Sequence, residues 1–143
     1  FYVHNLRGVT RVDYDGDGAL DFVAVGNPSR DGTPGIQDTQ NRTFLYENQL
    51  QSDEFVQLWV HNPDGIDRNA EIYVETDRRT IYRVANARSD FQSQDSRLVH
   101  VGLANEQLER VVVEWPDGTE TAYDALQESE RYFLRPDGAE MVE

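Results

Sequence analysis

Cysteine and lysine are both absent from this chain of 143 residues. Without cysteine, neither disulfide bonds nor thiolate metal sites contribute to the fold. All 13 basic residues are arginines, and they stand against 27 Asp and Glu residues, which leaves a net charge of −14. A surface this acidic disfavours nucleic acid and anionic membranes as partners, because binding to either one needs a basic face.

Long apolar runs and helical periodicity are also missing. No stretch approaches the roughly 18 consecutive apolar residues of a membrane-spanning helix, so we expect no membrane insertion. The chain consists instead of short segments rich in β-branched and aromatic residues, with turns of Gly, Pro, Asn and Asp between them. Strands spaced about ten residues apart are typical of an all-β sandwich or barrel.

The most informative segment that is present begins at residue 13 and reads Asp-Tyr-Asp-Gly-Asp-Gly-Ala-Leu-Asp. It places carboxylates at its positions 1, 3, 5 and 9, which are Asp13, Asp15, Asp17 and Asp21. Oxygen ligands at this spacing suit calcium, a hard cation with a flexible coordination shell. Without a cation, carboxylates about 5 Å apart repel by about 3 kcal/mol per pair at an effective dielectric of about 20. We predict a calcium site formed by these four side chains and the backbone carbonyl of Ala19.

The residues on both sides of this loop predict strands rather than helices. A helix–loop–helix calcium site needs a bidentate Glu at position 12 of its loop, where this chain has Ala24. Residues 8–12 before the loop and 20–26 after it are rich in β-branched residues or alternate in polarity. We therefore expect the loop to join the two strands of a hairpin, whose tip the cation neutralises.

The polar residues 49–54 are the best candidate for a domain boundary. We expect one calcium-binding β domain at residues 1–50 and a second β domain at residues 51–143. The predicted fold is all-β, with one calcium-loop hairpin or blade packed with a small antiparallel β-sandwich or barrel.

Two parts of the chain resemble known families. Residues 8–22 resemble an FG-GAP/VCBS repeat, the calcium-loop blade of integrin-like β-propellers, and residues 44–48 are similar to its terminal strand. Ser93-Gln94, residues 100–103 and residues 111–118 resemble the ASPIC/UnbV module, which commonly follows such repeats in secreted and surface proteins. The resemblance implies a calcium-stabilised, non-enzymatic module at an extracellular or cell-surface location.

No pattern in the sequence indicates catalysis. His4, His61 and His100 fall in separate segments, and no serine-containing motif accompanies them. Paired acids for glycoside hydrolysis stay open as an alternative in a chain with 27 Asp and Glu residues, although nothing selects a pair. We therefore predict a protein that is not an enzyme.

Several aromatic residues could bind sugar rings by stacking, namely Trp59, Tyr73, Tyr82, Trp115 and Tyr123. Trp115 precedes a Pro-Asp-Gly turn, which favours a core or hairpin anchor. Tyr73 and Tyr82 lie on the two arms of a predicted hairpin, which favours a cross-strand pair. A carbohydrate- or protein-binding module of a larger secreted protein is therefore the alternative function.

Two further features fit a surface protein that assembles. Asn41 opens an Asn-Arg-Thr triplet, which is a candidate glycosylation site. A lone blade leaves strand edges unpaired, and such edges commonly pair with another chain. Residues 1–6 could lie in the sheet of a neighbouring copy, and head-to-tail repetition of that contact gives a filament. Alternatively, this segment pairs within its own blade or with further blades, and the partners are other surface proteins or glycans.

Overall fold

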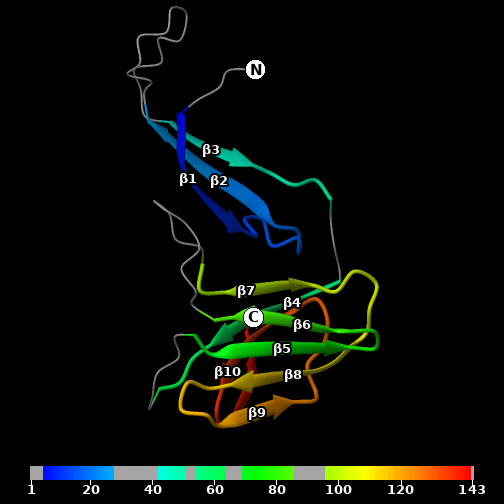
Figure 1. The fold of residues 1–143 in the computed structure, drawn as a ribbon. Coiled ribbons are helices and arrows are strands. Elements are labelled where there is room, and N and C mark those ends of the chain that lie inside the picture. Colours follow the sequence, from blue (N-terminus) through cyan, green and yellow to red (C-terminus); the bar gives the residue numbers. More distant parts are fainter. Residues whose placement is uncertain (1–4, 28–41, 51–53, 64–68, 86–95, 143) are drawn as a thin grey trace, which may run out of the picture. The chain divides into compact units, whose positions relative to one another are not determined.

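The computed structural model describes residues 5–27, 42–50, 54–63, 69–85 and 96–142 (Figure 1). Within these ranges the chain forms eleven strands and no helix, which confirms the predicted all-β class. The strands belong to two compact units, one formed by β1–β3 and the other by β4–β11. No helix in the part of the chain that the structure describes is long and apolar enough to cross a membrane.

Unit 1 is a three-stranded antiparallel sheet with the strand order β1–β2–β3 (Figure 1). Its strands are β1 (Asn5–Val12), β2 (Asp21–Asn27) and β3 (Arg42–Tyr46). The β1–β2 ladder ends where Val12 pairs with Asp21, so the residues between them form the connecting loop. The acidic segment therefore lies at the tip of a hairpin, as the sequence predicts.

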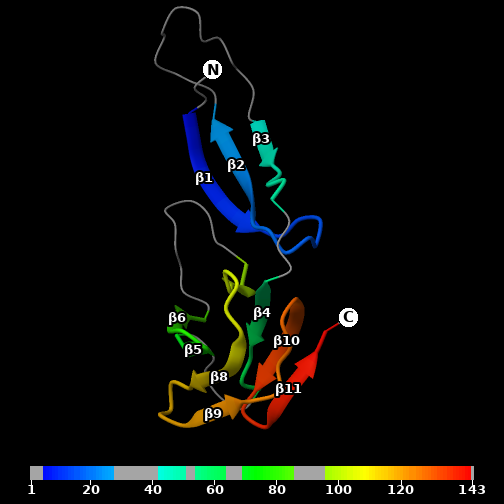
Figure 2. The same cartoon turned by 90° about the vertical axis from the view of Figure 1, so that its right-hand side faces the viewer.

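Unit 2 contains two four-stranded sheets, which form two layers (Figure 2). The first sheet has the order β11–β10–β4–β7, and the second has the order β6–β5–β8–β9. The strands are β4 (Phe55–Val60), β5 (Glu71–Thr76), β6 (Thr80–Val84), β7 (Val99–Gly102), β8 (Leu108–Glu114), β9 (Glu120–Tyr123), β10 (Glu130–Arg135) and β11 (Gly138–Met141).

The core of unit 2 lies between its two sheets, because both of them contribute buried side chains to it. Along β5, Ile72 and Val74 are fully buried, whereas Tyr73 between them is only half-buried. This alternation follows from the two-residue period of a strand. Leu58 and Leu134 contribute to the same core from the other sheet. The second part of the chain is therefore a β-sandwich.

One strand pair departs from the antiparallel arrangement that we expected. Strand β10 runs parallel to β4, from Glu130 opposite Val56 to Leu134 opposite Val60. Parallel neighbours need a long crossover connection. Here the chain leaves β4, forms β5 and β6 of the second sheet, returns to the first sheet as β7, adds β8 and β9 to the second sheet, and only then forms β10 beside β4.

Candidate metal centre

The loop between β1 and β2 turns with the help of two glycines. Gly16 and Gly18 have φ angles of 77° and 84°, a left-handed conformation that costs glycine little and other residues more. A side chain at position 16 would meet no neighbouring atom within 4 Å, so the backbone conformation is what requires glycine there. The sequence motif thus specifies the sharp bend that brings its acidic residues together.

Three carboxylates converge in this loop. One oxygen from each of Asp13, Asp15 and Asp21 can be chosen so that the three atoms lie within 4.8 Å of one another. Two oxygens that bind the same calcium at about 2.4 Å lie at most about 4.8 Å apart, so this spacing fits a shared calcium ion. The three residues form an acidic group that could hold a metal ion, and we call it the acidic triad.

Asp21 anchors the triad to the sheet. Its carboxylate is fully buried and accepts two backbone hydrogen bonds, from the N–H of Tyr14 at 2.8 Å and from that of Asn48 at 2.7 Å. The first bond holds the loop closed, and the second ties the segment after β3 to the start of β2. Each carboxylate oxygen has two lone pairs, so Asp21 can still coordinate a cation.

Asp17 and Ala19 have a local role in the loop. Oδ1 of Asp17 accepts a hydrogen bond from the N–H of Ala19 at 2.9 Å, and the N–H of Asp17 donates to Oδ1 of Asp15 at 3.3 Å. These contacts are turns of the kind that aspartate commonly forms with the backbone two residues ahead. The structure brings together three of the four predicted carboxylate ligands, and Asp17 lies outside the triad.

The three residues of the acidic triad differ in their burial. Asp15 is exposed, Asp13 is half-buried and Asp21 is inaccessible. Oδ1 of Asp13 is buried and accepts no hydrogen bond from the described residues, although the residue makes other polar contacts. A cation bound here would therefore have protein on one side and solvent on the other, which suits an ion that keeps water among its ligands.

Asn48 is a residue of this site that the sequence reasoning missed. It lies 27 residues beyond Asp21, yet its backbone N–H binds the Asp21 carboxylate. Its own Oδ1 accepts a hydrogen bond from the N–H of Leu50 at 3.2 Å, which shapes the turn after β3. The sequence feature that could have identified it is its position at the end of residues 44–48, the segment that resembles the terminal strand of an FG-GAP/VCBS repeat.

The other candidate residues lie at several places. Trp115 is 2% exposed and part of the core, which confirms the predicted anchor. Tyr73 pairs with Tyr82 across β5 and β6 with ring centroids 5.5 Å apart, which confirms the predicted pair. The Tyr73 hydroxyl donates to Glu71 at 2.7 Å, and that hydrogen bond raises the pKa of Tyr73 to about 12. Tyr123 is buried in the core.

The histidines that the structure describes both contact aromatic rings. His100 stacks on Phe55 with centroids 5.5 Å apart, and the ring of His61 meets that of Phe133 edge-on at 5.8 Å. These packing contacts agree with a structural role for both histidines. His4, together with the rest of residues 1–4, and Asn41 lie outside the described residues.

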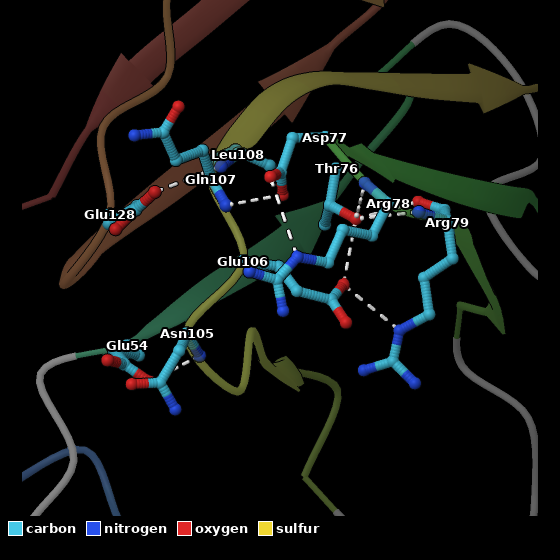
Figure 3. A network of polar contacts seen from close by, with 10 residues as sticks. All are labelled: Glu54, Thr76, Asp77, Arg78, Arg79, Asn105, Glu106, Gln107, Leu108 and Glu128. Atoms are coloured by element: carbon cyan, nitrogen blue, oxygen red, sulfur yellow. Dashed lines mark hydrogen bonds and ion pairs between the residues drawn. The ribbon is translucent and has the colours of Figure 1, made fainter.

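A second polar cluster joins the β5–β6 turn to the loop before β8 (Figure 3). Thr76 donates from Oγ1 to Oε2 of Glu106 at 2.8 Å, and Nε of Arg79 donates to the same oxygen at 3.0 Å. The N–H of Gln107 donates to Oδ1 of Asp77 at 2.9 Å. Because these groups satisfy one another's hydrogen-bonding capacity, we interpret the cluster as a structural contact that holds two loops of unit 2 together.

Comparison with known proteins gave one family. A family model described as ASPIC and UnbV matches residues 60–140, a range that includes strands β5–β10 of unit 2 and most of β11. No curated protein matches the chain. The family match does not reach the acidic loop, so the FG-GAP/VCBS resemblance of that segment stays a prediction.

Proposed function

Since this chain belongs to the ASPIC and UnbV family, we propose that it is a non-enzymatic, calcium-binding module of an extracellular or cell-surface protein with a structural or adhesive role. The observation that carries the proposal is the convergence of Asp13, Asp15 and Asp21 at the tip of the β1–β2 hairpin. The bound ion would offset two of the three negative charges of the triad and fix the hairpin tip against the segment after β3.

Calcium is favoured over magnesium by the chemistry of the loop. Magnesium demands near-ideal octahedral geometry at about 2.0–2.1 Å, whereas calcium tolerates six to eight oxygens at about 2.3–2.6 Å. An irregular nine-residue turn with carboxylates at different depths meets the looser requirement more readily. Calcium sites of extracellular modules commonly have Kd values of about 10⁻⁴–10⁻³ M, which such an open site would match.

We expect the full chain to bind one calcium ion at this loop, as measured by isothermal titration calorimetry. At a calcium concentration of about 100 times Kd, binding should stabilise unit 1 by about 2.7 kcal/mol. The double variant Asp13→Asn/Asp15→Asn should lose both the heat of binding and the stabilisation. Asp21 is left intact in this variant, so its two hydrogen bonds to the backbone remain.

A matched control tests whether calcium binds at the acidic loop or at acidic residues in general. Asp124→Asn/Asp137→Asn changes the charge by the same amount at two exposed positions of unit 2. We expect this control to bind calcium as the unmodified chain does. Equal loss in both double variants, or calcium binding that survives Asp13→Asn/Asp15→Asn, would contradict the proposed site.

The assembly part of the proposal rests on the apolar surface of unit 1. Phe22 pairs with Tyr46 on one face of the sheet, where they are 45% and 53% exposed. Val25 and Leu45 lie on the opposite face, at 45% and 44%. These side chains leave apolar surface on both faces of the sheet that a partner would cover. We propose that other copies of the chain, or other surface proteins, bind at unit 1.

The strand edges of unit 1 support the same proposal. Strands β1 and β3 form the two edges of the sheet, and an edge can pair with a strand from another chain. Asn5 and Leu6 already pair with β2, which agrees with intrachain pairing for the end of the segment 1–6. A neighbouring strand would therefore bind on the outer edge of β1 or of β3.

If the chain polymerises head to tail, sedimentation velocity in calcium should show species that grow with protein concentration, and negative-stain images should show filaments. Deleting residues 1–6 should remove these polymers. Tyr82→Ala, which removes an exposed aromatic ring from unit 2, should leave them unchanged. A chain that stays monomeric at the highest concentration would refute self-assembly, while the calcium site would stand.

A further inference from the structure

The outer face of the first sheet of unit 2 carries an aromatic strip that the calcium site does not involve. Trp59 and Phe133 are direct neighbours across the β4–β10 pair, so both point away from the core residues Leu58 and Leu134. Their rings are stacked, with centroids 6.0 Å apart and planes inclined by 18°. The two strands thus form a small aromatic surface on the outside of the sandwich.

Phe133 is half-buried, whereas Trp59 is accessible. The Arg135 guanidinium lies over the Phe133 ring, with Cζ 4.8 Å from its centroid, and His61 meets the same ring edge-on. Phe133 is therefore held from several sides and positions its neighbours. Trp59 keeps 40% of its surface exposed and offers the larger ring to solvent.

A row of hydrogen-bonding side chains continues the strip along the same face. Gln57 is 1% exposed although it lies on the outer side of the sheet. Its Oε1 accepts a hydrogen bond from Nε of Arg131 at 2.8 Å, and its Nε2 lies 3.4 Å from Nδ1 of His100. These contacts hold the Arg131 and Gln57 side chains in fixed positions two residues along from Phe133 and Trp59.

The charge of this face is opposite to that of the chain. Two arginines, Arg131 and Arg135, project from β10, and the one acidic residue on the outer side of these strands is Glu140, 3.6 Å from Arg135. The chain as a whole has a net charge of −14. Screening over about 8 Å at physiological salt lets such a local patch act on a ligand that touches it.

From these observations we propose that the face formed by Trp59, Phe133, Arg131 and Arg135 binds an anionic pyranose polysaccharide with uronic acid units. Gln57, which is buried, positions Arg131 and does not contact the ligand. The apolar C–H face of a sugar ring stacks on the exposed indole of Trp59. Arginine forms charge-assisted hydrogen bonds with a carboxylate on that ring. This site lies in unit 2 and does not depend on the calcium loop of unit 1.

A sugar fits this face better than a protein partner does. Stable protein interfaces bury about 800 Å² per partner around an apolar centre. On the outer side of these strands, the described large apolar residues with substantial exposure are Trp59 and, at the rim, Val142. One accessible ring beside guanidinium groups matches the size and polarity of a sugar unit.

The test uses the calcium-saturated full chain and two probes with the same β-1,4-linked backbone, cellouronate and neutral cello-oligosaccharide. We expect cellouronate to bind at least about tenfold more tightly, the factor that corresponds to about 1.4 kcal/mol, and to weaken as salt rises. Trp59→Ala should reduce binding of cellouronate by at least about tenfold, and Arg135→Gln should reduce it toward the level of the neutral probe. Trp59→Phe, which keeps an aromatic ring, should retain part of the affinity.

Tyr82→Ala is the matched control, because Tyr82 is 48% exposed on the outer face of the other sheet. It should leave binding of cellouronate unchanged, as should Asp13→Asn/Asp15→Asn in the calcium loop. The melting temperature of Trp59→Ala should stay close to that of the unmodified chain, so that lost binding is not lost folding. Equal affinity for both probes, no binding of either, or full affinity in Trp59→Ala would overturn the proposal.

Discussion

Replacing Asp21 by Ala should unfold unit 1 while unit 2 stays folded. The substitution leaves the backbone N–H groups of Tyr14 and Asn48 without their acceptor. Both donors are partly buried, and an unsatisfied donor costs about 1–3 kcal/mol, so the expected loss is about 2–6 kcal/mol before the relieved repulsion with Asp13 and Asp15 offsets part of it. That is a large share of the stability of an ordinary domain, about 5–15 kcal/mol, and a three-stranded sheet lies at the low end.

Hydrogen exchange measured peptide by peptide in the full chain separates the two units. In Asp21→Ala, amides of β1–β3 should lose protection, and amides of β4–β11 should keep it. The experiment is done in a chelator, so that the hydrogen bonds rather than the metal are tested. Asp15→Asn is the control, because Asp15 is exposed and its loss relieves repulsion when no cation is bound. Unchanged protection in Asp21→Ala would show that Asp21 does not hold the unit together.

The second large effect is expected at Trp115. Its side chain is 2% exposed in the core of unit 2, and its Nε1 donates to Oγ1 of Thr121 at 2.9 Å. Trp115→Ala removes that packing and leaves a cavity, which costs about 3–5 kcal/mol. The midpoint of urea unfolding should fall accordingly, and Trp59, the other tryptophan of the chain, reports it by fluorescence.

The comparison variant is Trp59→Ala, read out through the fluorescence of Trp115. Because Trp59 is 40% exposed on the outer face, its loss should cost less than about 1 kcal/mol. The two substitutions delete the same side chain from the same unit. Similar unfolding midpoints for both variants would contradict the assignment of Trp115 to the core and Trp59 to the surface.

Local patterns in the sequence predicted much of the fold. The alternation of polar and apolar residues over 71–76 and 80–84 predicted the β5–β6 hairpin with its Tyr73–Tyr82 pair. The spacing of aspartates and glycines between two strand-like segments placed the acidic loop at a hairpin tip. These features depend on neighbours in sequence, whose backbone preferences the residue types reveal directly.

Contacts between distant segments were not predictable in the same way. The parallel β4–β10 pair depends on where the chain returns after it has built the second sheet, and residue periodicity does not encode that choice. Strand β11 was missed because its residues Gly138–Met141 are all exposed and show no alternation. The bond from Asn48 to Asp21 joins residues 27 apart, so only the folded sheet reveals it.

The most direct test of the calcium site is a crystal structure of the full chain grown in millimolar calcium, with anomalous scattering data collected to locate the metal. We predict one anomalous peak in the β1–β2 loop, bound by carboxylate oxygens of Asp13, Asp15 and Asp21. No peak at that position, with the three carboxylates separated and facing solvent, would contradict the central claim.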